Sequence, residues 1–143
     1  MIINKYLDRN ENIEINFTIY LTSSERQRTQ QRIVLENAQS LYLRLPRGKI
    51  IQDGDILQSE NGEITLKILA KSEPIITVKA SNQLTLIKAA YHLGNRHIPL
   101  EITNDYLRFS PDKILEEMLI TMGLNLITEN ATFFPEVGAY HKH

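Results

Sequence analysis

The spacing of apolar residues changes near residue 70, and this change most strongly limits which folds the 143-residue chain can adopt. Before it, apolar and polar residues alternate at 13–21, at 41–45 and at 64–68, so each run would place its apolar side chains on one face of a strand. Turn-forming sequences separate the runs: Pro46-Arg47-Gly48, Asp53-Gly54-Asp55 and Asn61-Gly62. Several short strands at this spacing predict a small antiparallel β barrel or sandwich domain over residues 1–72.

After residues 70–74, segments with the two-residue spacing of strands alternate with segments that have the 3.6-residue spacing of helices. It predicts, in order, a strand at 75–80, a helix from Ser81, strands at 98–102 and 106–109, a helix from Ser110-Pro111-Asp112, and a strand at 124–133. The order β-α-β-β-α-β is typical of a ferredoxin-like domain, here over residues 73–143. The predicted fold class is therefore α+β, with two domains.

Both predicted helices carry an apolar stripe. In the first helix, Leu84, Ile87 and Tyr91 recur at helical spacing, and Gly94 is expected just past its end in the left-handed conformation. In the second, Ser110 is expected to cap the helix and Gly123 to end it. Its expected buried stripe is Ile114, Leu115, Met118, Leu119 and Met122.

Composition narrows the function classes. The chain is 42% hydrophobic, which suffices for a folded core, and its formal net charge of -1 supplies no basic field for nucleic acid or an anionic membrane. It has no cysteine, which excludes disulfides and thiolate metal sites. Neither a signal peptide nor an apolar run of about 20 residues is visible. We expect a cytoplasmic protein without membrane or nucleic-acid partners.

The four histidines form two short clusters, His92 with His97 and His141 with His143, and this distribution suggests a metal ion. On a continuous helix, residues five apart are rotated by about 140°, so the first pair cannot chelate as helical neighbours. Gly94 would end the helix and leave His97 on a turn. In an extended tail, His141 and His143 face the same way and could close on one ion with the terminal carboxylate.

Each histidine also has an ordinary structural interpretation. His92 suits the C-terminal end of a helix, where the dipole favours a cation, and its position with Thr85 and Lys88 makes it solvent accessible. His97 could be a loop residue without a role, and the tail could be disordered. From these patterns alone, a ferredoxin-like module that binds nucleic acid or protein without metal, and a metal-dependent hydrolase, stay open as alternatives.

Several longer motifs resemble those of a known protein family. The chain resembles the urease accessory nickel metallochaperones of the UreE type over nearly its whole length, most specifically in Ala90-Tyr91-His92-Leu93-Gly94-Asn95-Arg96-His97. The other matching segments are Leu45-Pro46-Arg47-Gly48 with Asp53-Gly54-Asp55, Leu115-Glu116-Glu117-Met118-Leu119 up to Gly123, and Phe134-Pro135-Glu136-Val137-Gly138-Ala139-Tyr140.

The resemblance implies a homodimeric carrier of Ni(II) for urease maturation and not an enzyme. It implies that the N-terminal domain binds partners, namely a urease accessory GTPase and the urease apoprotein complex, and that the C-terminal domain dimerises. It makes His97 the main nickel ligand, His141 and His143 auxiliary ligands, and His92 a weaker candidate. Zn(II) or Cu(II) could occupy the same histidines in vitro.

The chain departs from the family pattern at two places. Lys113 stands where members often carry a histidine beside the aspartate that opens the second helix. The sequence reaches His143 without a long histidine-rich tail, so we expect transfer of nickel with little storage.

Overall fold

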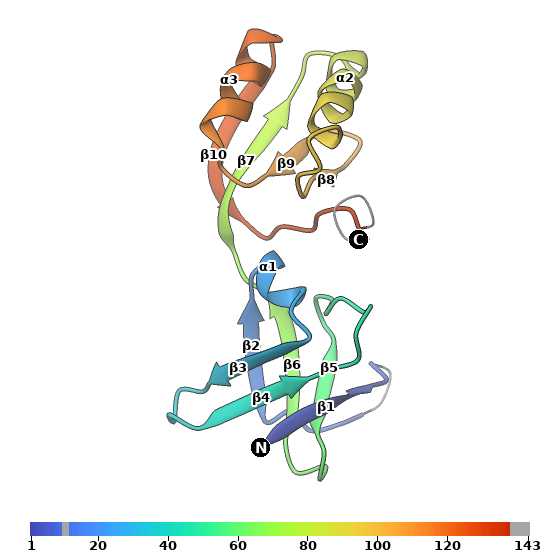
Figure 1. The fold of residues 1–143 in the computed structure, drawn as a ribbon, viewed down its shortest axis with the longest axis vertical. Helices are drawn as coiled ribbons and strands as arrows, with labels where there is room; N and C mark the ends of the chain where they lie inside the picture. The colour runs from blue at the N-terminus through green and yellow to red at the C-terminus, as the bar shows by residue number, and fades with distance from the viewer. Residues whose placement is uncertain (10–11, 138–143) are drawn as a thin grey trace. The chain divides into compact units, whose positions relative to one another are not determined.

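A computed structural model describes residues 1–9 and 12–137 (Figure 1). The chain divides into two compact units, Met1–Lys71 and Ser72–His143. Among the described residues, no helix combines the length and the apolar character that crossing a membrane requires.

The first unit is a curled sheet of six strands in the order β2-β6-β5-β1-β4-β3. Its elements are β1 (Ile2–Leu7), β2 (Phe17–Leu21), α1 (Ser23–Arg26), β3 (Gln30–Val34), β4 (Ser40–Arg44), β5 (Ile56–Ser59) and β6 (Thr65–Ala70). The small β domain predicted from the alternating pattern is confirmed. Two pairings, β1 with β4 and β2 with β6, are parallel, whereas the other three are antiparallel.

Alternation places one face of each strand in the core of this unit. In β4, Leu41 and Leu43 are buried whereas Tyr42 and Arg44 are exposed, and Leu66 and Ile68 of β6 are fully buried. Each buried aliphatic side chain contributes about 1.5–3 kcal/mol. The core cluster comprises Ile3, Leu21, Leu35, Leu41, Leu43, Leu45, Ile51, Leu57, Leu66 and Ile68.

The second unit has the predicted ferredoxin-like order. Its elements are β7 (Glu73–Lys79), α2 (Gln83–Gly94), β8 (Glu101–Ile102), β9 (Leu107–Phe109), α3 (Lys113–Thr121) and β10 (Asn125–Ala131). The four strands form an antiparallel sheet in the order β10-β7-β9-β8, and both helices lie on one face of it (Figure 1). The predicted α+β class is confirmed.

The core of this unit lies between that face and the helices. Ile76 and Val78 of β7 and Leu107 and Phe109 of β9 meet one buried residue row from each helix. The helical rows are Leu86, Ala89 and Leu93 of α2, and Leu115 and Leu119 of α3.

The predicted apolar stripes are only partly buried, and the expected burial of Ile114 on the second helix is wrong. Leu84, Ile87 and Tyr91 of α2 are 60%, 58% and 66% exposed, because the core takes the row that begins at Leu86. On α3, Ile114 is 76% exposed, whereas Leu115 and Leu119 are buried as expected. In both helices the core uses only part of the apolar surface that the sequence offers.

Helix ends also differ from the predictions. Asn82, not Ser81, caps α2 by accepting the amide of Thr85 at 2.9 Å. Asp112, not Ser110, caps α3 by accepting the amides of residues 114 and 115, and its own amide donates to the Glu116 carboxylate at 3.0 Å. Gly123 ends α3 at φ +90°, as predicted.

Candidate metal centre

His97 stands at the end of α2 with a left-handed backbone. Its φ is 56°, and its amide donates to the Gly94 carbonyl at 3.0 Å, while the Arg96 amide donates to Leu93 at 3.1 Å. The expectation that Gly94 would be the left-handed residue is wrong: Gly94 is the last helical residue, and the reversal comes three residues later. Left-handed backbone costs a residue with a Cβ roughly 1–2 kcal/mol, and such strained positions cluster at functional sites.

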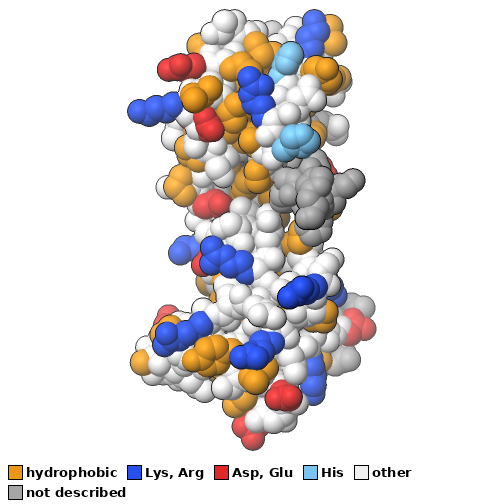
Figure 2. All heavy atoms as spheres, viewed as in Figure 1, with side chains coloured by type: hydrophobic (Ala, Val, Ile, Leu, Met, Phe, Trp, Pro, Cys, Tyr) orange, Lys and Arg blue, Asp and Glu red, His pale blue; other side chains and the backbone are white. Residues whose placement is uncertain are grey.

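This conformation turns the chain sharply out of the helix and leaves the His97 side chain exposed. His92, in the last turn of α2, is exposed as well, and its ring meets that of Tyr91 edge to face at a centroid distance of 5.2 Å. Both histidines of the described chain, pale blue in Figure 2, lie at the surface. They are open to an incoming ion.

An exposed apolar stripe runs along α2 to the turn that holds His97. Leu84, Ile87 and Tyr91 occupy one side of the helix at spacings of three and four residues and are each more than half exposed. Contiguous exposed apolar surface of this kind marks an interaction site in soluble proteins. The uncovered apolar surface therefore lies on the helix that leads directly into the histidine turn.

The described residues of this chain do not by themselves gather the ligands of a metal site. Across residues 1–9 and 12–137, no group of three or more His, Cys, Asp or Glu side chains converges on one point. His141 and His143 lie outside the described residues. Lys113, the first residue of α3, is exposed.

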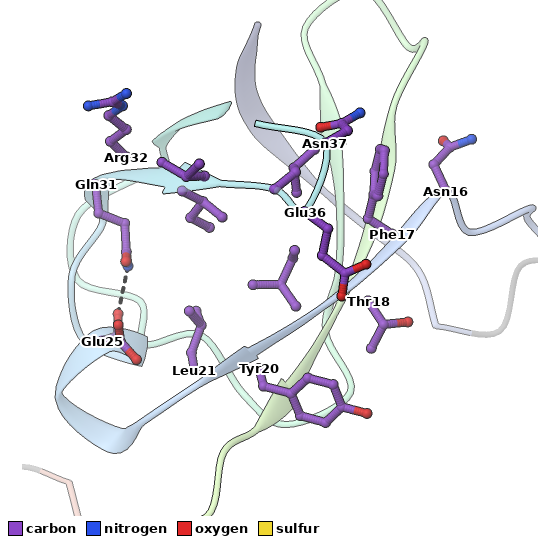
Figure 3. A pocket seen from close by; sticks show the side chains of 14 residues that line it. Asn16, Phe17, Thr18, Tyr20, Leu21, Glu25, Gln31, Arg32, Glu36 and Asn37 are labelled. Atoms are coloured by element: carbon purple, nitrogen blue, oxygen red, sulfur yellow. Dashed lines mark hydrogen bonds between the residues drawn. The ribbon is translucent and has the colours of Figure 1, made fainter. Parts of the chain in front are cut away.

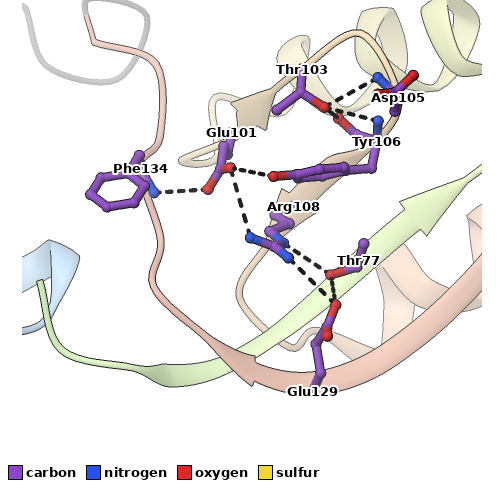
Figure 4. A network of polar contacts seen from close by, with 8 residues as sticks. All are labelled: Thr77, Glu101, Thr103, Asp105, Tyr106, Arg108, Glu129 and Phe134. Carbon is purple, nitrogen blue, oxygen red and sulfur yellow. Dashed lines mark hydrogen bonds and ion pairs between the residues drawn. The ribbon is translucent and has the colours of Figure 1, made fainter.

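A polar network covers the sheet face opposite the helices (Figure 4). Strand register places Thr77, Arg108 and Glu101 in line, because Thr77 pairs with Arg108 and Arg108 pairs with Glu101. The Arg108 guanidinium donates to Thr77 at 3.1 Å and lies 3.9 Å from Glu101 and 3.7 Å from Glu129, whose carboxylate also accepts the Thr77 hydroxyl. Sequence reasoning missed these residues because only the register brings them together.

The same network contacts the chain that follows β10. Phe134 donates its amide to Glu101 at 2.9 Å, and Glu136 donates its amide to the Leu100 carbonyl at 2.8 Å. Arg108 lies over the ring of Tyr106, 4.5 Å from its centroid. Carboxylates and a crossing segment thus occupy this face, where a nucleic-acid-binding ferredoxin-like domain presents stacking rings.

The first unit contains a groove of about 620 Å³ between its two edge strands (Figure 3). β2 and β3 are the first and last strands of the sheet order, so within the described part of the chain each has one side without a strand partner, and the curl of the sheet brings both to the groove. The lining includes Phe17, Ile19, Tyr20, Ile33 and Glu36. Unpaired strand edges are templates for adding an extended chain.

Comparison with known proteins assigns both units to one family. Residues 3–68 match the model of the N-terminal domain of the UreE urease accessory protein, and residues 73–143 match the model of its C-terminal domain. The chain belongs to the UreE urease accessory protein family. The family predicted from the Ala90–His97 block is confirmed, and the matched proteins are named urease accessory proteins.

Individual UreE relatives agree over most of both chains. Urease accessory protein UreE of a Nostoc species is 51% identical over 134 residues, which cover 94% of this chain and 91% of the relative. UreE of Microcystis aeruginosa is 52% identical over 128 residues, covering 89% and 80%. UreE of Shewanella halifaxensis is 39% identical over 126 residues, covering 88% and 73%.

Proposed function

We propose that this UreE-family protein carries Ni(II) for urease assembly, with His97 as its principal ligand. The observation that carries the proposal is the backbone of His97, which holds an exposed imidazole in a left-handed turn at the end of α2. A non-glycine residue in this conformation is uncommon, and strained positions of this kind cluster at functional sites. Imidazole is a suitable ligand for Ni(II).

We further propose that a second copy of the chain completes the site. One subunit offers too few ligands in its described part, and the exposed stripe of Leu84, Ile87 and Tyr91 ends beside the His97 turn. A two-fold contact is self-complementary, so pairing two α2 stripes would bury both and bring two His97 turns toward one axis. The ion would then be held mainly by the homodimer.

His141 and His143 would supply auxiliary ligands from the tail, and His92 a weaker one. A site of a few imidazoles without thiolate holds its ion loosely enough to release it to a partner. It should also accept Zn(II) or Cu(II) in vitro, because the affinity order places copper above nickel. In this proposal nickel is cargo that is delivered, in the cytoplasm, and not a resident cofactor.

Calorimetric titration of Ni(II) into three proteins tests the ligand assignment. The variants are His97→Asn, since asparagine tolerates left-handed backbone, and His92→Ala, an equally exposed histidine of the same segment. We expect His97→Asn to abolish the tightest binding event and His92→Ala to retain it, with circular dichroism unchanged in both. Unchanged tight binding in His97→Asn refutes the proposal.

We also propose that the first unit is where the urease accessory GTPase and the urease apoprotein complex dock. The support is the groove between β2 and β3, whose two free edges could both hydrogen-bond an inserted strand. Tyr20→Ala, inside the groove, should weaken binding of these partners, whereas Tyr42→Ala, an exposed tyrosine of β4 outside it, should not. Equal effects of the two substitutions in a binding assay would argue against the groove.

A further inference from the structure

We propose that Glu101 is a positioning residue that leads the C-terminal chain across the sheet to the edge beside His97, and so brings the tail histidines within reach of the metal. The inference rests on the proposed function for the metal, but its structural part concerns only contacts within the second unit. Those contacts are the hydrogen bond from the Phe134 amide to Glu101 (Figure 4) and the hydrogen bond from the Glu136 amide to the Leu100 carbonyl.

The strand that precedes the tail, β10, lies at the opposite edge of the sheet from β8. β10 ends at Ala131, and β10 and β8 are the two outer strands of the order β10-β7-β9-β8. Three strand spacings of about 4.8 Å separate them, or roughly 14 Å. The Phe134 amide bonds to Glu101 of β8, and the Glu136 amide bonds to Leu100 just before that strand. Within five residues of Ala131 the chain has therefore crossed to the β8 edge.

Glu101 is held in place for this contact. It is 7% exposed, and its Oε2 faces the Tyr106 hydroxyl at 3.5 Å and the Arg108 guanidinium at 3.9 Å. Arg108 is itself fixed by Thr77 and Glu129. These partners occupy one oxygen and leave Oε1 to accept the Phe134 amide at 2.9 Å. The network thereby orients a buried carboxylate toward the crossing chain.

The crossing shortens the path from the tail to His97. Leu100 is three residues from His97, and His141 is five residues beyond Glu136, a span of at most about 17 Å when extended. Without the contacts at residues 134 and 136, the free chain would start after the buried side chain of Phe133, eight residues before His141. Because effective concentration falls with roughly the 3/2 power of linker length, lengthening the free chain from five to eight residues lowers it about twofold.

A comparison of Glu101→Met with Glu101→Gln distinguishes the effect of losing the hydrogen-bond acceptor from the effect of changing the side-chain shape. Methionine fills the buried space without a strong acceptor, whereas glutamine keeps a carbonyl oxygen for the Phe134 amide. In the metal-free protein, NMR amide exchange at Phe134 and Glu136 should accelerate at least tenfold in Glu101→Met and stay near wild type in Glu101→Gln. Glu129→Gln, which alters the network at its contacts with Arg108 and Thr77 and keeps the Glu101 acceptor, is the matched control and should leave both amides protected.

A double-mutant cycle with deletion of residues 141–143 then tests the role in metal capture. Glu101→Met should weaken the tail-dependent Ni(II) step about twofold in the full chain and have no effect in the truncated chain. An equal loss in both backgrounds, or unchanged amide exchange, overturns the inference.

The cycle also distinguishes this inference from the proposed function. If truncation changes no step of the titration, the auxiliary-ligand part of the proposed function fails, and the role of Glu101 in metal capture fails with it. If truncation weakens binding but Glu101→Met does not, only the inference about Glu101 fails.

Discussion

Replacing His97 by glycine should make the metal-free protein more stable while removing its nickel binding. At φ 56° a Cβ costs roughly 1–2 kcal/mol, whereas glycine adopts this backbone freely and is the usual residue where a helix reverses. Glycine loses about 0.5–1 kcal/mol more backbone entropy on folding. The difference leaves a net gain of about 0.5–1 kcal/mol in the free energy of unfolding for His97→Gly.

His97→Ala is the matched control, because alanine removes the imidazole but keeps the Cβ and its penalty. The two variants lose the same ligand, so any difference in their stability reports the backbone. A gain of about 0.5–1 kcal/mol would raise the midpoint of a unit of this size by about 2–8 °C.

The assay is thermal and urea unfolding with a chelator present and protomer concentration held constant, since dimerisation would make the midpoint depend on concentration. We expect the order of stability to be His97→Gly, then wild type, with His97→Ala close to wild type or below it. If glycine destabilises the protein as much as alanine or more, no backbone strain is held at residue 97, and the reason for assigning it a functional role from the backbone is lost.

Three other predictions concern separate surfaces. Ile87→Glu on the α2 stripe should convert a dimer to a monomer by light scattering, whereas Ile120→Glu, equally exposed on α3, should leave it a dimer; two dimers would refute the α2 contact. Burial, reinforced by the charge of Asp55, raises the pKa of Tyr6 to about 12. Because the unfolded chain loses this proton near pH 10, the contribution of Tyr6 to the free energy of unfolding should be fully present below about pH 10 and should be lost as the pH rises toward 12. Tyr6→Phe removes a buried hydroxyl that has no hydrogen-bond partner among the described residues. The variant should abolish that fall, and at pH 7 it should be neutral or stabilising by up to about 1 kcal/mol. If urea titrations of Tyr6→Phe still show the fall, the assignment to Tyr6 is refuted. Deleting residues 141–143 should leave the metal-free unfolding midpoint unchanged but weaken nickel binding in calorimetry; a lower midpoint would make the tail structural.

Local patterns were enough to predict the fold class. Alternation at 41–45 and 64–68 reflects strands with one buried face, and that pattern depends only on neighbouring residues. The short helix α1 was not predicted, although its signal was present: Thr22 and Glu25 form a reciprocal capping box. The cap of α3 was misplaced because Ser110 and Asp112 both suit that role, and the Asp112 carboxylate is the one that bonds two helix amides.

The polar network could not be predicted because it depends on strand register. Thr77, Glu101, Arg108 and Glu129 come from four strands, and no spacing in the sequence links them. The family motif pointed to the histidine block, but it did not indicate that a buried glutamate would hold the chain beyond β10. The strand register brings these polar residues, which are distant in the sequence, together beside the segment 134–136.

The misread stripe of α2 and the candidate metal centre are connected. A helix carrying Leu84, Ile87 and Tyr91 on one side and Leu86, Ala89 and Leu93 on the other has more apolar surface than one sheet can cover. Sequence periodicity cannot tell which row a subunit buries, because both rows have helical spacing. Leaving the larger side chains exposed costs hydrophobic burial, about 1.5–3 kcal/mol for a residue such as Leu84, so the folded subunit gains by finding a cover for them. A second α2 is a cover of the right chemistry, and it would place a second His97 turn beside the first. In the proposed dimer, burial of the exposed apolar row and assembly of the nickel ligands would therefore occur together.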